Sequence, residues 1–151
     1  MSTDGTLALS DLVHRIAEAV IAYATPGDPW RVSPWPYDAF PGGTGETAEH
    51  HAFAVWPTST ALQPQRRSGA QVVRTRIGIR WIHKLNADNA MSDALAALDA
   101  ESSLIAAVLG APPDPNLAIA LAEITTRATT ADGTLFLGEV AFDLLHLYQT
   151  S

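Results

Sequence analysis

Five histidines are the side chains in this sequence best suited to acid–base or metal chemistry: His14, His50, His51, His83 and His146. His50 and His51 are adjacent, so on an extended strand their rings would point to opposite faces. A metal site would need one of them to meet His83 across a hairpin, together with a carboxylate such as Glu49. No HxH or HExxH spacing supports this arrangement, so we expect neither a metal nor another cofactor.

The other candidate catalytic groups do not form a recognisable constellation. The chain has no cysteine, which excludes thiolate nucleophiles and thiolate-bound metals. Ser102 falls inside a predicted helix, without the turn that exposes a nucleophilic serine. Asp99 and Glu101 are two residues apart on that helix and do not face each other. Glu139 and Asp143 share a strand face but are separated by about 13 Å. We therefore predict that the protein is not an enzyme.

The basic residues are concentrated in one block, although the net charge is −7. Six of the nine lie within residues 66–84, which contain no acid: Arg66, Arg67, Arg74, Arg76, Arg80 and Lys84. Binding to a phosphate backbone is one interpretation, but the acidity of the rest of the chain opposes it. Pairing with acids of the same subunit or of a neighbour is the other. Only 17% of residues are charged, which favours a surface that contacts other subunits.

The hydrophobic pattern predicts the elements that position these groups. Apolar residues at helical spacing predict a helix over 11–24, capped by Ser10, and a second helix ending near Gly110. The second helix carries an apolar stripe at Met91, Leu95, Leu98, Ile105 and Leu109, and Asp93, Asp99 and Glu101 fall on or near its opposite side. Residues 26–49 form a loop rich in proline and aromatic residues, which either folds back on its own core or reaches a partner.

Strand signals account for the remainder of the chain. Alternating residues predict a long hairpin over 51–84, in which Pro57 ends the first strand and residues 58–69 form a polar connection. Further strands are predicted at 117–129 and 135–149. These elements predict one domain over 1–151 of the α+β class. Its antiparallel sheet has about four strands with two helices packed on one face, in αββαββ order. No apolar run approaches the roughly 20 residues that span a bilayer.

This arrangement resembles the tail terminator (tail completion) proteins of long-tailed bacteriophages and of phage-derived particles such as gene transfer agents. The resemblance rests on the opening helix LVHRIAEAVIA, the strand RTRIGIRWIHK leading directly into AMSDALAALDAESSLIAAVL, and the closing hairpin TADGTLFLGEVAFDLLHLYQ. It covers roughly residues 10–24 and 51–149, and the loop at 26–49 lies outside it.

The resemblance implies a structural virion protein at the tail–neck junction, assembled in the bacterial host cytoplasm. It implies a hexameric ring of this chain that caps the tail tube and ends its polymerisation. The ring would also join the tail to a head-completion or stopper protein, while DNA passes through without sequence recognition. The implied partners are therefore the chain itself, the tube protein, the head-completion protein and DNA, and no membrane.

The family carries no catalytic motif, so the expected interface residues come from charge alone. Opposite charges suit a head-to-tail contact between subunits. On this basis we expect Arg74, Arg76 and Arg80 to face Asp93, Asp99, Glu139 or Asp143 of a neighbour, although pairing within the subunit remains the alternative. Arg66 and Arg67 are the candidates for contact with the tail tube.

Two other functions remain open from the sequence. One is a different head–tail joint protein, an adaptor or stopper. The other is a small α+β ligand-binding or enzyme domain with a pocket lined by Trp56, Trp81 and His83.

Overall fold

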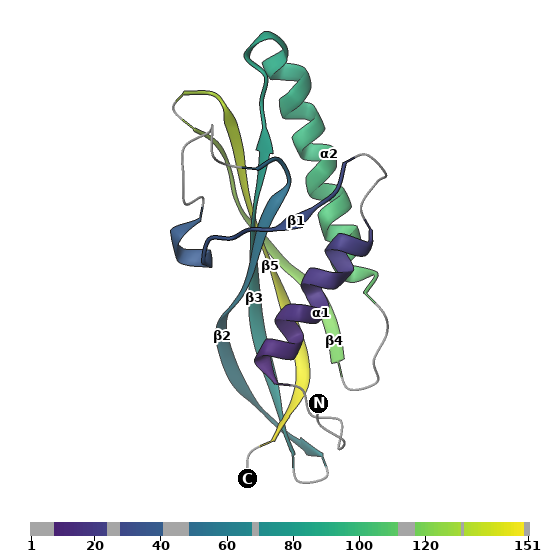
Figure 1. Ribbon diagram of the computed structural model, residues 1–151. Helices are drawn as coiled ribbons and strands as arrows, with labels where there is room; N and C mark the ends of the chain where they lie inside the picture. The colour runs from purple at the N-terminus through teal and green to yellow at the C-terminus, as the bar shows by residue number, and fades with distance from the viewer. Residues whose placement is uncertain are drawn as a thin grey trace.

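The computed structural model describes residues 8–23, 28–40, 49–67, 70–111, 117–130 and 132–149. The molecule is elongated, and its long strands run along the long axis (Figure 1). The helices, short 3-10 turns (η) and strands are, in chain order, α1 (Leu9–Ala22), β1 (Arg31–Val32), η1 (Tyr37–Ala39), β2 (Ala52–Arg67), β3 (Ala70–Lys84), η2 (Ala87–Asn89), α2 (Ala90–Leu109), β4 (Leu117–Thr129) and β5 (Leu135–Gln149).

The strands form one mixed sheet in the order β1-β2-β3-β5-β4. All neighbours pair antiparallel except β1, which runs parallel to β2. Asp28, just before β1, makes an additional isolated β-bridge. The α+β class agrees with the prediction, but the antiparallel sheet of about four strands is wrong. The extra β structure comes from the proline-rich segment, where two paired residues are too few to leave an alternating pattern.

The first strand of the hairpin continues further than its sequence indicates. We expected Pro57 to end its first strand and residues 58–69 to form a polar connection, yet β2 continues to Arg67. The reason is that β1 pairs only with Ala52 and Phe53, so Pro57 lies on a free edge where its missing N–H breaks no ladder bond. The register shifts between Pro57 and Ser59, which places an irregularity at this edge.

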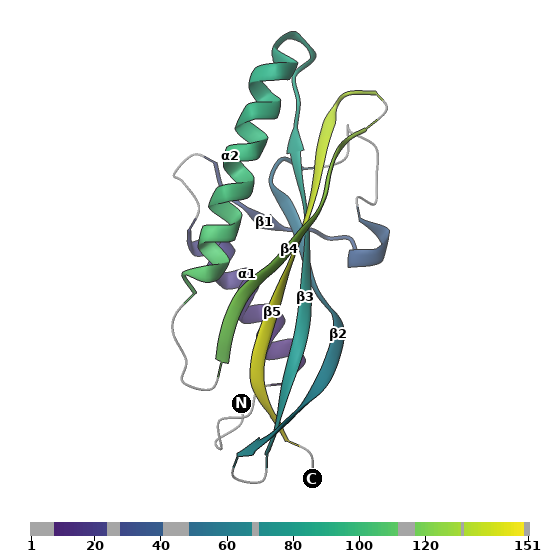
Figure 2. The same cartoon turned by 180° about the vertical axis from the view of Figure 1, so that it is seen from behind.

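The core lies between one face of the sheet and both helices. In β3, Ile77, Ile79 and Trp81 are fully buried on this face, whereas the arginines alternate onto the other. Val140 and Phe142 of β5 join the same cluster, together with buried residues from α1 and α2. Figure 2 shows the opposite, helix-free face of the strands. The prediction of two helices on one face is therefore correct.

The helices differ from prediction in how they begin and which way they face. α1 begins at Leu9, so Ser10 lies inside the helix and does not cap it. α2 packs on the sheet with a narrow set of mostly small residues, namely Ala97, Ala100, Glu101, Leu104, Ala107 and Val108. Four residues of the predicted apolar stripe, Met91, Leu95, Leu98 and Leu109, therefore point outward, whereas Ile105 packs against the core. Leu104 and Val108, on the wider apolar face of the predicted helix, are buried as expected. Glu101, expected on or near the polar side, is buried. The small residues form the true packing face because they bring the helix close to the sheet.

The described part of the Pro/Trp-rich segment folds back on the protein's own core, one of the two predicted outcomes. Trp30 is buried in the main core, and Tyr37 is buried on the helix-free face. Residues 41–48, which include the Gly-rich stretch, lie outside the described residues. No described helix has the length and hydropathy needed to cross a membrane.

Candidate functional site

Three histidines meet where the end of β3 lies beside the residues that precede β2. The Nε2 atom of His51 lies 2.9 Å from Nδ1 of His83, within hydrogen-bonding distance. The ring of His50 stacks on that of His51, with centroids 3.9 Å apart, and lies edge-on to that of His83 at 4.5 Å. One nitrogen of each ring falls within 4.8 Å of the others. We call His50, His51 and His83 the histidine cluster.

The cluster exists because the backbone is not extended at this point. His51 has φ 58°, the left-handed conformation, and the Ala52 N–H donates to the Glu49 carbonyl to close a turn. On the extended strand predicted from the sequence, the two adjacent rings would point to opposite faces. That expectation is wrong because the left-handed residue turns both rings to the same side. His83, near the end of β3, is buried.

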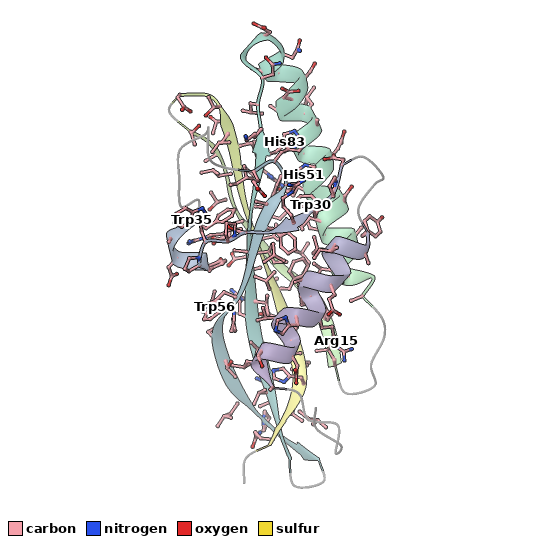
Figure 3. The ribbon with its side chains drawn as sticks, viewed as in Figure 1. Arg15, Trp30, Trp35, His51, Trp56 and His83 are labelled. Carbon is pink, nitrogen blue, oxygen red and sulfur yellow. The ribbon has the colours of Figure 1, made fainter. Side chains whose placement is uncertain are left out.

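Asp28 and Trp30 complete the surroundings of the cluster. One oxygen of Asp28, Oδ1, lies 3.1 Å from Nδ1 of His51 and 3.4 Å from Nε2 of His50. The indole of Trp30 stacks on His51 with centroids 4.1 Å apart (Figure 3). Glu49, the carboxylate that the sequence pointed to, lies 3.5 Å from Arg31 instead. No local sequence pattern indicates Asp28, which comes from the proline-rich segment.

Burial shifts the acid–base behaviour of the cluster. Desolvation above all, and the neighbouring His50 after it, lower the pKa of His51 to about 4 against the opposing effect of Asp28. Desolvation is also the main reason that the pKa values of His50 and His83 lie below the usual value of 6.5. All three imidazoles are therefore neutral near pH 7, the form that ligates metal ions.

A cavity of about 190 Å³ opens beside the cluster. Asp28, Trp30, His51 and His83 line one side, and residues of α2, including Asp99 and Ser103, line the other. It differs from the pocket that the sequence suggested for a ligand-binding domain. Trp81 is fully buried, and Trp56 is 55% exposed, so those two residues do not share a pocket with His83.

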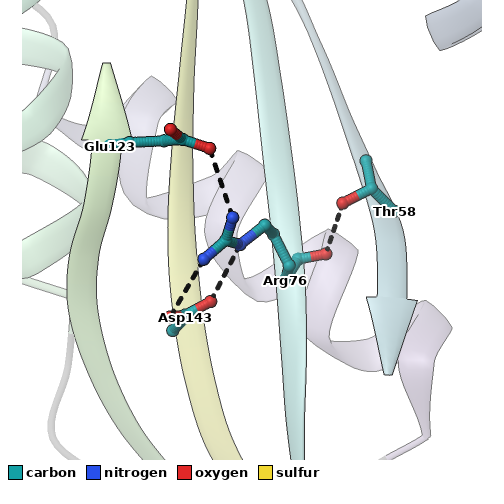
Figure 4. A network of polar contacts seen from close by, with 4 residues as sticks. All are labelled: Thr58, Arg76, Glu123 and Asp143. Carbon is teal, nitrogen blue, oxygen red and sulfur yellow. Dashed lines mark hydrogen bonds and ion pairs between the residues drawn. The ribbon is translucent and has the colours of Figure 1, made fainter. Parts of the chain in front are cut away.

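The arginine row on the helix-free face forms its ion pairs within the chain. Arg76 lies directly opposite Asp143 in the register of β3 and β5. Its Nε donates to Asp143 Oδ1 at 3.1 Å, and its Nη1 donates to Glu123 Oε1 at 3.2 Å (Figure 4). Thr58 of β2 donates to the Arg76 carbonyl at 3.2 Å. The cross-strand register thus produces the intrasubunit alternative of the sequence analysis.

Arg80 repeats this arrangement four residues further along the same face of β3. It is opposite Glu139, and its Nε donates to Glu139 Oε2 at 2.7 Å. Its Nη1 donates to the Tyr37 carbonyl at 2.7 Å, and its guanidinium lies 4.2 Å from the centre of the Tyr37 ring. The Tyr37 hydroxyl donates to Glu139. Burial and the Glu139 carboxylate raise the pKa of Tyr37. These contacts hold residues 33–40 against the sheet.

The remaining predicted interface residues are separate from these pairs. Arg74 is exposed on β3. Asp93 accepts a hydrogen bond of 2.6 Å from the Asn86 N–H at the start of α2, and Asp99 faces the cavity. Arg66 and Arg67 end β2, where their backbone pairs with Gln71 and Ala70, and their side chains lie outside the described part of the structure.

One ion pair has no counterpart in the sequence analysis. The Arg127 guanidinium of β4 holds both oxygens of Glu101, with Nη2 to Oε1 at 2.7 Å and Nε to Oε2 at 2.9 Å. The Glu101 side chain is only 6% exposed, so this bidentate contact neutralises a buried carboxylate between α2 and β4. The two residues are 26 positions apart, and no local pattern indicates their contact.

Among the large apolar side chains that are exposed, two groups lie on different flanks of the molecule. The first group, which we call the α2 stripe, is Met91, Leu95, Leu98 and Leu109, with exposed fractions of 74, 57, 41 and 47%. The second, which we call the β2-flank patch, is Val32, Trp35 and Trp56, with 56, 46 and 55%. Figure 3 shows Trp35 and Trp56 on the side of the molecule away from α2.

Comparisons with known proteins add no functional information, so a functional conclusion depends on the geometry described above. No protein-family model matches the sequence, and no curated protein matches it.

Proposed function

We propose that the protein is a ring-forming structural component of a phage-type tail, a tail terminator that caps the tail tube at the tail–neck junction of the virion. In this proposal the ring stops tube polymerisation, presents a surface to the head-completion protein and lets DNA pass through. The single observation that carries the proposal is the α2 stripe, because it gives the chain an apolar surface that a second copy would cover.

The α2 stripe needs a partner for a physical reason. α2 packs on the sheet through its small residues while Met91, Leu95 and Leu98 face outward. A helix that is apolar on both sides is normally buried on both sides. Met91, Leu95 and Leu98 follow one another at steps of four and three residues, so they form an apolar strip that can fit against another protein surface.

The β2-flank patch supports a second copy of this chain as the partner. It lies on the far side of the sheet order from β4 and β5, the strands that α2 contacts. Two different patches on opposite flanks suit a head-to-tail contact, in which the α2 stripe of one copy covers the β2-flank patch of the next. A head-to-tail contact repeats around a closed ring when its rotation closes. Because Arg76 and Arg80 are paired within the chain, this interface is apolar rather than ionic at its centre.

The remaining contacts of the ring follow from the shape of the subunit. The β2–β3 hairpin extends to one end of the elongated molecule (Figure 1). We assign this end, which carries Arg66 and Arg67, to the tail tube. The net charge of −7 favours a channel that DNA crosses without adsorbing, because adsorption grows with each phosphate that is neutralised.

Two charge insertions test the interface. Leu95→Glu places a carboxylate in the α2 stripe, and Trp56→Glu places one in the β2-flank patch. We expect each variant to remain folded and to lose ring assembly in sedimentation velocity, because a buried unpaired charge is costly. His14→Glu is the matched control, since it adds the same charge to the exposed side of α1, outside both surfaces.

Mixing the two variants distinguishes a head-to-tail interface from a symmetric one. Leu95→Glu keeps an intact β2-flank patch and Trp56→Glu keeps an intact α2 stripe, so their 1:1 mixture should form a heterodimer with one wild-type junction. Rings that persist in either variant would contradict the proposed interface. A mixture that stays monomeric while the wild type forms rings would rule out pairing between the two patches.

A further inference from the structure

The histidine cluster is not explained by a structural role in a ring. It brings together three imidazoles, two of them buried, beside a carboxylate and a cavity. We infer that His50, His51 and His83 bind a divalent transition-metal ion of the zinc type, with Asp28 as the acidic partner of the site. This inference concerns the isolated subunit and does not depend on the proposed ring.

The closest pair of nitrogens already has nearly the separation that a shared metal ion requires. His51 Nε2 and His83 Nδ1 are 2.9 Å apart. Two nitrogens bound to tetrahedral zinc at 2.0–2.1 Å are separated by about 3.3 Å. A small outward shift of either ring therefore replaces the shared hydrogen bond with two metal–nitrogen bonds. Both rings are anchored, His51 by its stacking on Trp30 and His83 by its position in β3.

Asp28 has the position of a carboxylate that supports a metal-binding histidine. Its Oδ1 lies 3.1 Å from Nδ1 of His51, the nitrogen on the far side of the ring from His83. Nδ1 is buried there without a well-aligned hydrogen bond. Carboxylates beside the second nitrogen fix the tautomer of a metal-bound imidazole and raise its basicity. The negative charge of Asp28 also offsets the charge of a bound cation.

His50 is the most accessible of the three candidate ligands. Its side chain is 37% exposed, and its Nε2 lies 3.4 Å from Asp28 Oδ1, so the ring has room to turn toward an ion between the three residues. Its Nδ1 currently accepts a hydrogen bond of 3.1 Å from the Lys84 N–H. Metal binding would exchange this hydrogen bond for a bond to the ion.

The donor set selects the class of cation. Three neutral imidazoles favour Zn²⁺, Co²⁺, Ni²⁺ or Cu²⁺ over Mg²⁺ and Ca²⁺, which prefer oxygen ligands. The adjacent cavity of about 190 Å³ provides a route for the ion and space for water or another small ligand beside it.

The experiment uses the full chain without a histidine tag, freed of metal by chelation and dialysis. Zinc binding is measured by titration calorimetry, and Co²⁺ is added separately to record its visible absorption. The two cluster variants are His51→Asn and His83→Gln. Asparagine is chosen at position 51 because it tolerates the left-handed backbone there. His14→Asn is the matched control because it removes an exposed histidine of α1. Circular dichroism establishes that each variant is folded.

We expect one zinc ion per chain, a visible Co²⁺ spectrum typical of four- or five-coordination, and zinc affinity weakened at least about 100-fold in His51→Asn and His83→Gln. His14→Asn should bind like the wild type. Absence of saturable binding by the wild type would overturn the inference, and so would equal affinity in the folded cluster variants. Should a cluster variant fail to fold, the wild-type Co²⁺ spectrum decides, since a spectrum unchanged from that of the hexaaqua ion would overturn the inference.

Discussion

A single buried hydrogen bond illustrates how residue chemistry sets the pH response of this protein. His146 of β5 is 2% exposed, and its Nε2 lies 2.7 Å from the hydroxyl oxygen of Thr75. Desolvation lowers the pKa of His146 below its usual value. The unfolded chain therefore takes up a proton near pH 6.5 that the folded chain does not, and the folded state loses stability as the pH falls below that value.

This linkage gives a prediction at the residue scale. The free energy of unfolding of the wild type should decrease as the pH is lowered from 7 to 5. In Thr75→Val/His146→Leu, which replaces both partners by apolar groups, the decrease should be smaller by up to about 1.4 kcal/mol per pH unit. The part that remains comes from the histidine cluster. Urea unfolding at each pH measures the difference.

His14→Gln serves as the control for that comparison, because His14 is exposed on α1. It should leave the pH dependence of stability as in the wild type. A double variant whose stability falls as steeply as that of the wild type would show that His146 is not kept neutral by burial.

At the scale of elements, β3 organises the sheet through its two faces. One face supplies Ile77, Ile79 and Trp81 to the core, and Gly138 lies directly opposite Trp81 in β5. A Cβ at Gly138 would lie 2.2 Å from the indole nitrogen, so only glycine leaves room for the ring. The other face carries Arg80, which joins β5 to the segment of Tyr37.

The Arg80 contacts give a prediction at this scale. Arg80→Glu removes two hydrogen bonds and the cation–π contact with Tyr37, and it places two carboxylates opposite each other. We therefore expect it to lower the free energy of unfolding by about 1–2 kcal/mol. Arg74→Glu is the matched control, because Arg74 is exposed on the same face of the same strand. It should cost clearly less in chemical denaturation. Equal losses in the two variants would mean that the Arg80 network adds nothing to stability.

The elements with strong periodic patterns could be predicted from the sequence. The strands at 117–129 and 135–149 have the predicted bounds, because alternation and a turn at Asp132 and Gly133 define them locally. The direction of α2 could not be predicted in this way. Both of its sides are apolar, and the smaller residues face the core because the helix packs closely on the sheet.

The histidine cluster could be anticipated only in part. The sequence shows the residue types, and the predicted hairpin could bring His50 or His51 close to His83. The decisive feature is the left-handed backbone at His51, which no neighbouring residue signals in the sequence. Asp28 lies beside the cluster because β1, which follows it, pairs in parallel with β2. Local sequence patterns do not specify this long-range contact. The ion pairs of the arginine row likewise depend on the register of β3 and β5.

At the scale of the whole molecule, the two apolar flanks set the expected assembly. The α2 stripe and the β2-flank patch lie at opposite sides of the sheet, and the charged row between them is neutralised within the subunit. In the proposed assembly, the α2 stripe of each copy contacts the β2-flank patch of the next. Under the proposal, repetition of this contact about a common axis closes a ring, for which the tail terminator proposal predicts six copies.

Native mass spectrometry over a concentration series tests the ring most directly. The predicted species is a hexamer of about 96 kDa, built from six chains of 16.0 kDa each, which grows with concentration at the expense of the monomer. A chain that stays monomeric up to its solubility limit, or that stops at a symmetric dimer, would contradict the proposal that this protein forms a head-to-tail ring.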